Sequence, residues 1–271
     1  MLAVMPKMTV IVLGSGTSQG VPLIGCRCAV CLSADPRDQR SRSSLYVATP
    51  ELRLLVDTTP DLRQQALREG LDRIDAVLFT HAHADHIMGF DDLRRFCEMR
   101  GAPLPIYGSE PTLAQIERTF FYAFHPRKAV LGYVHALPHI VTGPFQLGEL
   151  EITPLPVPHG AVSTLGFLFS HGGRKLLAYL SDCAAVPGPI RDTVAGAEAL
   201  IIDGLRDAPH PTHLTVAGAV EAAQAIGARQ TFITHLTHEK NHADRERGLP
   251  PGIRATYDGM KLDFELNPVL S

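Results

Sequence analysis

The sequence predicts an α/β fold in which two packed sheets are flanked by helices. Short apolar runs of strand length alternate with segments of helical periodicity in both halves of the chain. Polar residues that can bind a ligand repeatedly follow the ends of these runs, as expected at one edge of a sheet. No sequence repeat or low-complexity linker divides the 271 residues, so we expect one domain over 1–271.

The first half of the chain is predicted to alternate strands and helices. Strand-like runs occupy 9–13, 45–47, 52–56, 76–79 and 104–108. Asp61 is expected to cap a helix that ends at Gly70, and a further helix is expected to follow residue 86 and run through Phe96. Pro111 opens a helix that runs to about Phe124. The aromatic stretch 120–124 fits a lid or a platform for base stacking, but such a stretch is more often core or a dimer contact. The segment 126–144 gives no clear assignment.

The second half continues the alternation. Strands are predicted at 150–156, 166–170, 175–180, 199–203, 230–234 and 261–266. The turn at 171–173 joins two of them into a hairpin, and His159 is expected in a loop. Helices are predicted at 189–194 and about 215–226.

Composition narrows the class of protein. Hydrophobic residues make up 45% and charged residues 20%, which is typical of a globular protein. The formal net charge of −3 argues against long nucleic acid as a partner. Lys7 interrupts the apolar N-terminus, and no run has the length of a membrane span. The five cysteines do not suggest a disulfide framework, so we expect a reducing cytoplasm.

Four potential metal ligands lie within six residues, on the loop after the run 76–79. They are His81, His83, Asp85 and His86. Imidazole nitrogen and carboxylate oxygen together suit Zn²⁺, Mn²⁺ or Fe²⁺, and four such groups exceed what one open catalytic metal takes from so short a segment. Two metals are therefore expected. The alternative is a chance grouping among thirteen histidines, against which the HxHxDH spacing after a strand argues.

Three further residues are candidates to complete this site. His159 lies between Pro158 and Gly160, Asp182 follows the run 175–180, and His235 follows the run 230–234. Each alone would more often be a capping or surface group. Their shared position after strands favours a common site.

A second metal site is predicted from Cys26, Cys28 and Cys31, which form a CxCxxC motif. Three thiolates need a fourth ligand to close a tetrahedral structural zinc site. His238 is the candidate, because it lies three residues after His235 and can face the cysteine loop while His235 faces the other site. A loop of free thiols or a redox pair is the alternative.

The order HxHxDH, His159, Asp182, His235 resembles the ligand pattern of the metallo-β-lactamase superfamily. The resemblance implies a four-layer αββα sandwich. It also implies a division of the ligands, in which one metal is held by His81, His83 and His159, the other by Asp85, His86 and His235, and Asp182 bridges them. Asp57 resembles the early strand-end Asp of that family, which orients ligands from behind.

The chain also resembles the PhnP-type phosphodiesterases. The motifs that carry this resemblance are the glycine-rich segment 14–22, CxCxxC, HxHxDH, the pair His235 and His238, and the segment 257–260. In those enzymes a histidine upstream of the last metal ligand contacts phosphate and assists the leaving alkoxide, and His213 matches its position. The alternatives are that His213 has no chemical role or that His210 is the matching residue. PqqB proteins share the CxCxxC loop, but their histidine cluster is degraded and this one is intact.

Three functions follow as hypotheses. The first is hydrolysis of a small anionic phosphodiester, a cyclic ribose phosphate or a nucleotide, by hydroxide formed at two divalent metals, Mn²⁺ or Zn²⁺, beside one structural Zn²⁺. The second is hydrolysis of a lactone or thioester on the same metals. The third is a metal-stabilised binding protein without turnover. The sequence leaves the oligomeric state open, with a homodimer among the options.

Overall fold

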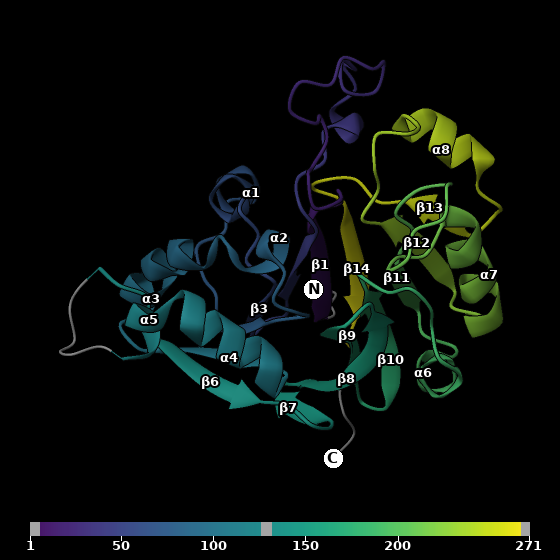
Figure 1. Ribbon diagram of the computed structural model, residues 1–271. Helices are drawn as coiled ribbons and strands as arrows, with labels where there is room; N and C mark the ends of the chain where they lie inside the picture. Colours follow the sequence, from purple (N-terminus) through teal and green to yellow (C-terminus); the bar gives the residue numbers. More distant parts are fainter. Residues whose placement is uncertain (1–5, 126–131, 267–271) are drawn as a thin grey trace, which may run out of the picture.

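The computed structural model describes residues 6–125 and 132–266. Two seven-stranded sheets form its centre (Figure 1). The strands of the first sheet are β1 (Lys7–Gly14), β2 (Ser44–Ala48), β3 (Arg53–Val56), β4 (Ala76–Leu78), β5 (Leu104–Gly108), β6 (Ala136–Ile140) and β14 (Lys261–Glu265). The strands of the second are β7 (Phe145–Leu147), β8 (Leu150–His159), β9 (Val162–His171), β10 (Arg174–Leu180), β11 (Ala199–Asp203), β12 (Gln230–Thr234) and β13 (Ile253–Ala255).

Both sheets are mixed. The order in the first sheet is β14-β1-β2-β3-β4-β5-β6, and the strands from β3 to β6 run parallel. The order in the second sheet is β13-β12-β11-β10-β9-β8-β7, and the strands from β10 to β13 run parallel. Parallel neighbours place their carboxyl ends at the same sheet edge, which is where the candidate ligands occur.

Helices cover the outer face of each sheet. The first sheet carries α1 (Leu62–Glu69), α2 (Ala84–Ile87), α3 (Arg94–Arg100), α4 (Glu110–Thr119) and α5 (Phe121–Phe124), with a short 3-10 turn at Phe90–Leu93. A second 3-10 turn, Pro36–Asp38, lies in the loop that projects from the sheets (Figure 1). The second sheet is accompanied by α6 (Gly188–Val194), α7 (Val216–Ile226) and α8 (His242–Gly248). Figure 1 shows the two groups of helices on opposite sides of the strands. None of the helices in the described part of the chain is long and apolar enough to cross a bilayer.

Three apolar cores hold these layers together. The largest lies between the sheets, where side chains such as Val10 and Leu54 meet Phe167 and Ile201. A second core packs α1 to α5 on the first sheet, and a third packs α6 and α7 on the second. The predicted four-layer αββα sandwich is therefore confirmed.

Several elements differ from the sequence-based expectation. The strand predicted at 150–156 continues to His159, which is its last residue rather than part of a loop. Prolines at 154, 156 and 158 concealed this extension. Alternate residues of a strand direct their backbone N–H groups to the same side, so the three prolines all lack an N–H on one side of β8. Strand β7 pairs only with residues 150–152, so β8 has no partner strand on that side at the prolines and can still pair with β9 on the other.

The helix predicted to run from Pro111 to about Phe124 is broken. Phe120 has φ −120° and ψ 45°, which ends α4 and begins α5. Phe120 is buried and stacks on Phe90, whereas Phe121 and Tyr122 are exposed, so the aromatic stretch is divided between core and surface. Strands β6, β7 and β13 and helix α8 had no counterpart in the prediction. Part of the unassigned segment, 126–131, lies outside the described residues.

Candidate metal centre and hydrolytic site

The candidate ligands meet where several strands end. His81 comes three residues after β4, while Asp85 and His86 lie on α2, so the predicted loop includes one helical turn. His159 ends β8, Asp182 follows β10, and His235 directly follows β12. The structure thus brings together all seven residues of the predicted cluster from both sheets.

The first group of ligands consists of His81, His83 and His159. His83 Nδ1 lies 2.9 Å from His81 Nε2 and 3.3 Å from His159 Nε2. Nitrogens bound to one metal at about 2.0–2.1 Å lie roughly 3.0–3.4 Å from each other. The spacing of the three rings therefore fits a shared cation. His83 is exposed, which leaves this side of the group accessible.

The second group consists of Asp85, His86 and His235. His86 Nε2 lies 3.3 Å from Asp85 Oδ2, and His235 Nε2 lies 3.8 Å from the same oxygen. Asp182 lies between the groups. Its Oδ1 is 3.3 Å from His86 Nε2, and its Oδ2 is 3.3 Å from His235 Nε2 and 3.8 Å from His159 Nε2.

Buried polar atoms at the centre test whether these residues fit metals. His86 Nε2, His235 Nε2 and Asp182 Oδ1 have no hydrogen-bond partner within residues 6–125 and 132–266. Burying such groups without a partner is unfavourable, and divalent cations satisfy imidazole and carboxylate groups together. The donor set therefore fits divalent cations, and Asp182 lies near ligands of both groups.

Hydrogen bonds behind the ligands orient three of the rings. His159 Nδ1 donates to the carbonyl oxygen of Thr212 at 2.8 Å. His86 Nδ1 donates to Asp57 Oδ2 at 2.7 Å, and His81 Nδ1 lies 3.0 Å from Thr80 Oγ1. Each ring is therefore held by Nδ1, which leaves Nε2 to face the centre.

Two residues of the site have unusual backbone angles. Asp57 has φ 63° and His235 has φ 61°, a left-handed conformation that is uncommon for residues other than glycine. Both are almost fully buried. Strain of this kind persists where the surrounding structure enforces it, and it is frequent at functional sites.

Neighbouring charges in the centre oppose the effect of burial on its carboxylates and imidazoles. Burial would raise the pKa of Asp182, but His235 and His86 hold it well below its usual range. Burial would lower the pKa of His235, but Asp182 and Asp85 raise it to about 9. Burial and the neighbouring His86 lower the pKa of His81 well below its usual range. The carboxylates thus attract positive charge, which protons or metal cations can supply.

His213 lies at the side of this centre. Its Nε2 is 4.0 Å from Asp182 Oδ2, and its ring stacks on that of His235 at a centroid distance of 4.8 Å. Its Nδ1 donates to Asp203 Oδ2 at 2.7 Å. His210 is a neighbour, with ring centroids 5.0 Å apart, but it is not among the groups that approach Asp182.

Sequence analysis did not identify Asp203 as part of the site. It is fully buried at the end of β11 and also accepts a hydrogen bond from the backbone N–H of Cys183 at 3.0 Å. The signal was present, since Asp203 ends an apolar run in the same way as Asp182 follows one. Thr80 and Thr212 gave no such signal, because their roles depend on contacts across the fold.

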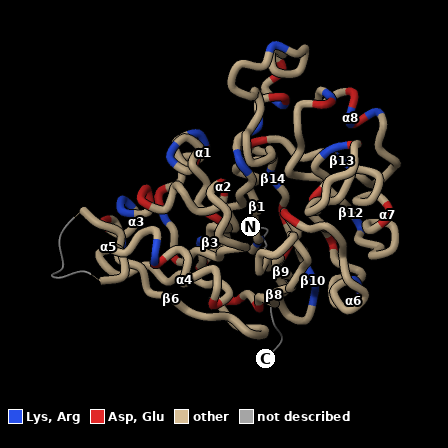
Figure 2. The backbone as a smooth tube through the Cα atoms, viewed as in Figure 1, with Lys and Arg blue, Asp and Glu red and all other residues tan. Residues whose placement is uncertain are grey.

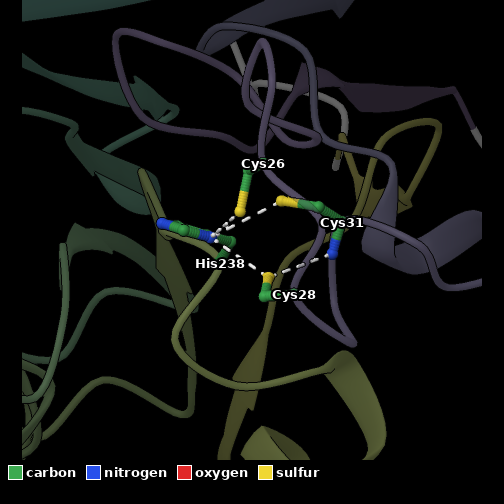
Figure 3. A group of neighbouring side chains, drawn as sticks. All are labelled: Cys26, Cys28, Cys31 and His238. Carbon is green, nitrogen blue, oxygen red and sulfur yellow. Dashed lines mark hydrogen bonds between the residues drawn. The ribbon is translucent and has the colours of Figure 1, made fainter.

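The predicted cysteine site is assembled as a separate cluster. His238 Nδ1 lies 3.5 Å from Cys26 Sγ, 3.3 Å from Cys28 Sγ and 3.5 Å from Cys31 Sγ (Figure 3). In a tetrahedral zinc site, with Zn–S about 2.3 Å and Zn–N about 2.0–2.1 Å, nitrogen and sulfur lie about 3.5 Å apart. The four residues therefore fit one structural Zn²⁺.

The thiols of this cluster differ in acidity. Hydrogen bonds from the backbone of Cys31 and from His238 lower the pKa of Cys28 to about 6. Burial raises the pKa of Cys31 to about 11. All five cysteines are free thiols rather than disulfides.

The two clusters are connected by the short segment 235–238. Leu236 N donates to the carbonyl oxygen of Ser15 at 3.1 Å, and Thr17 N donates to the carbonyl oxygen of Leu236 at 3.2 Å. The chain segment before the cysteine loop therefore holds the turn that places His235 in one site and His238 in the other.

Comparison with known proteins agrees with the fold and the arrangement of these residues. Residues 52–236, more than half of the chain, match the model of the Beta-lactamase superfamily domain. The chain therefore belongs to the metallo-β-lactamase superfamily, a family of hydrolases whose fold binds divalent metals. Among solved structures, a diphosphatase from the PhnP family is similar with a TM-score of 0.88 and 41% identity, over 96% of this chain and 98% of that one.

Other relatives are more distant or differ in length. Coenzyme PQQ synthesis protein B of Methylobacterium radiotolerans is 32% identical over 228 residues, 73% of each chain. Zn²⁺-bound PqqB from Methylobacterium extorquens shares the fold, with a TM-score of 0.78 and 24% identity over 94% of this chain and 100% of that one. An octanoyltransferase of Porphyromonas gingivalis is 37% identical over 261 residues, 94% of this chain. The chain spans only about half of that relative, 51% of its length.

Proposed function

We propose that the chain is a binuclear metal-dependent hydrolase that cleaves a small phosphodiester of the cyclic ribose phosphate or nucleotide type. The observation that carries this proposal is the arrangement of two ligand groups around Asp182, with the His213 and Asp203 pair beside them. Two divalent cations, Mn²⁺ or Zn²⁺, would supply Lewis acidity toward the phosphate and acidify the attacking water.

The residues of the chain have distinct tasks in this reaction. One cation would be held by His81, His83 and His159. The other would be held by Asp85, His86 and His235, and Asp182 would contribute to both. His213 presents Nε2 toward the centre because Asp203 accepts the hydrogen of Nδ1. A hydrogen on Nε2 could be donated to the leaving oxygen while Asp203 holds the ring through Nδ1.

Similarity to the PhnP-family diphosphatase supports a phosphorus substrate. That protein is similar over nearly the whole length of both chains at 41% identity. A diphosphate and a phosphodiester both require attack on phosphorus and departure of an oxygen leaving group, which the same residues can assist. The diphosphate linkage therefore belongs beside the diester in any test of substrates.

The charge distribution favours a small substrate over long nucleic acid. Basic and acidic residues lie next to each other along α3 and α8 (Figure 2). Pairs such as Arg95 with Glu98 leave little free positive charge there. Long nucleic acid requires an extended basic surface, whereas a small anion requires only the cations of the site.

A carbonyl substrate is the second candidate. The relative from Porphyromonas gingivalis is named an octanoyltransferase, and a metal centre of this type also polarises carbonyl oxygens. Because the chain spans about half of that relative, the acyl-transfer activity can belong to its other half. The phosphorus substrate therefore ranks first.

The first test measures hydrolysis of bis(p-nitrophenyl) phosphate by protein loaded with Mn²⁺ or Zn²⁺. We expect metal-dependent turnover that is lost in His81→Ala and retained in His125→Ala, a matched control in which an exposed histidine of another region is removed. A panel of a cyclic ribose phosphate, a 2′,3′-cyclic nucleotide, a dinucleoside diphosphate and a p-nitrophenyl ester then identifies the class. Turnover of the ester alone would transfer the proposal to carbonyl hydrolysis, and no turnover of any substrate would contradict it.

A further inference from the structure

A continuous chain of hydrogen bonds connects the two ligand groups from behind. Thr80 Oγ1 lies 3.0 Å from His81 Nδ1, and it donates to Asp57 Oδ2 at 2.7 Å. His86 Nδ1 donates to the same Asp57 oxygen at 2.7 Å. His81 belongs to one ligand group and His86 to the other, so Thr80 and Asp57 link both groups.

The direction of each hydrogen bond follows from the donors available. A threonine hydroxyl carries one hydrogen, and here that hydrogen is directed to Asp57. Toward His81 the Thr80 oxygen can therefore only accept, so His81 carries its hydrogen on Nδ1. The Asp57 carboxylate can only accept as well, so His86 also carries its hydrogen on Nδ1. Both rings consequently present a bare Nε2 to the metal centre.

Water does not reach the residues of this hydrogen-bond network. Thr80, Asp57, His81 and His86 are fully buried. The backbone N–H of Thr80 donates to Asp57 Oδ1 at 2.8 Å, and the Thr80 carbonyl accepts from Leu165 N at 2.9 Å. Thr80 is therefore fixed by both sheets, and its hydroxyl cannot be replaced by solvent without rearrangement.

We propose that Thr80 is a positioning residue for both cations, although it binds neither. Through Asp57 its hydroxyl fixes the orientation of His86 in one ligand group, and directly it fixes that of His81 in the other. Loss of the hydroxyl leaves His81 without its acceptor and leaves Asp57 with one donor fewer. Both binding sites are then less well organised before a metal arrives. This inference rests on the proposed binuclear centre.

The test compares Thr80→Val with Thr80→Ser. Valine has nearly the shape of threonine but no hydroxyl, whereas serine keeps the hydroxyl. Mn²⁺ binding to protein that retains its structural Zn²⁺ is followed by titration calorimetry, without any substrate. We expect the affinity of both Mn²⁺ ions to fall by about 10- to 100-fold in Thr80→Val, the range typical of residues that support ligands, and to be restored in Thr80→Ser.

The outcomes separate this inference from the function. If the wild-type chain binds two Mn²⁺ ions and Thr80→Val binds both with unchanged affinity, only the role of Thr80 is overturned. The same holds if Thr80→Val loses affinity for only one of the two ions. A wild-type chain that binds fewer than two ions would overturn the binuclear centre and this inference together. Thr80→Ala removes the same hydroxyl with less bulk, and it provides the same comparison if Thr80→Val does not fold.

Discussion

The cysteine cluster and the histidine cluster are built in different ways. Three of the four residues of the cysteine cluster lie within Cys26–Cys31, and His238 alone comes from a distant part of the chain. The histidine cluster combines residues that follow β4, β10 and β12, that end β8 and that lie on α2. One cluster is therefore largely local in sequence, and the other depends on the packing of two sheets.

The difference in construction corresponds to a difference in chemistry. Three thiolates and one imidazole complete a tetrahedral zinc site, so no position remains for a substrate. In the histidine cluster His83 is exposed, and His213 lies beside His159 and Asp182 although it is not one of the seven predicted ligands. The first site is suited to hold a loop, and the second is suited to chemistry.

The largest expected effect on turnover comes from Asp182→Asn. This change removes the charge shared by both ligand groups, where Asp182 faces His86 and His235 at 3.3 Å. We expect a loss of roughly 10⁴ in kcat, equivalent to about 5 kcal/mol of transition-state stabilisation. Metal analysis should show that the catalytic cations are depleted while the structural Zn²⁺ remains. Full activity with two cations retained would refute the bridging role.

A smaller effect is expected from His213→Gln. Glutamine can still form hydrogen bonds, but it cannot deliver a proton to the leaving oxygen, so kcat should fall by about 10²- to 10⁴-fold. Because His213 is not one of the seven predicted ligands, metal content should be unchanged, and a loss of metal would instead assign His213 to a group with His159 and Asp182. A substrate with an acidic leaving group, such as p-nitrophenolate, should be less affected than one with an alkoxide leaving group. Equal losses for both would argue against proton donation.

Asp203→Asn tests the residue that accepts the hydrogen bond from His213 Nδ1. Asparagine retains an oxygen that can accept from His213 Nδ1, but its amide can also turn its NH2 group toward Nδ1 and hold the ring in the wrong tautomer. We expect kcat to fall by about 10²-fold, with little change in KM, because only part of the protein would then hold His213 in the tautomer that can donate from Nε2. Steady-state rates at several pH values check this, and an unaltered kcat would limit Asp203 to a structural role.

The smallest effect on turnover is expected from Cys28→Ser. The variant should lose one Zn²⁺ per chain, measured by metal analysis, and about 4 kcal/mol of unfolding free energy, the stabilisation from a ligand at ~1,000 times its Kd. At 25 °C kcat should fall by no more than about tenfold, because His235 is also held by the strand before it. Tenfold is the lower limit of the effect that is typical when a residue supporting a metal ligand is changed. Complete loss of activity in a folded variant would show that the two sites are not separable.

Much of the fold was accessible from sequence because its strands are apolar and short. The runs at 199–203 and 230–234 agree with β11 and β12 to the residue. Prediction failed where local signals conflict with tertiary pairing. Prolines in β8 suggest a loop, yet β9 pairs with the strand as far as His159. In β6, four of the five residues are exposed, so no buried periodicity marks the strand.

The sequence by itself determined the identity of the candidate ligands. HxHxDH and CxCxxC place several donors within a few residues, where local backbone geometry alone keeps them near each other. Only the tertiary structure decided how the two histidine groups share Asp182, that Asp203 stands behind His213, and that Thr80 joins His81 to His86. The physical reason is that distances between strand ends depend on sheet order, register and packing, which no local spacing encodes.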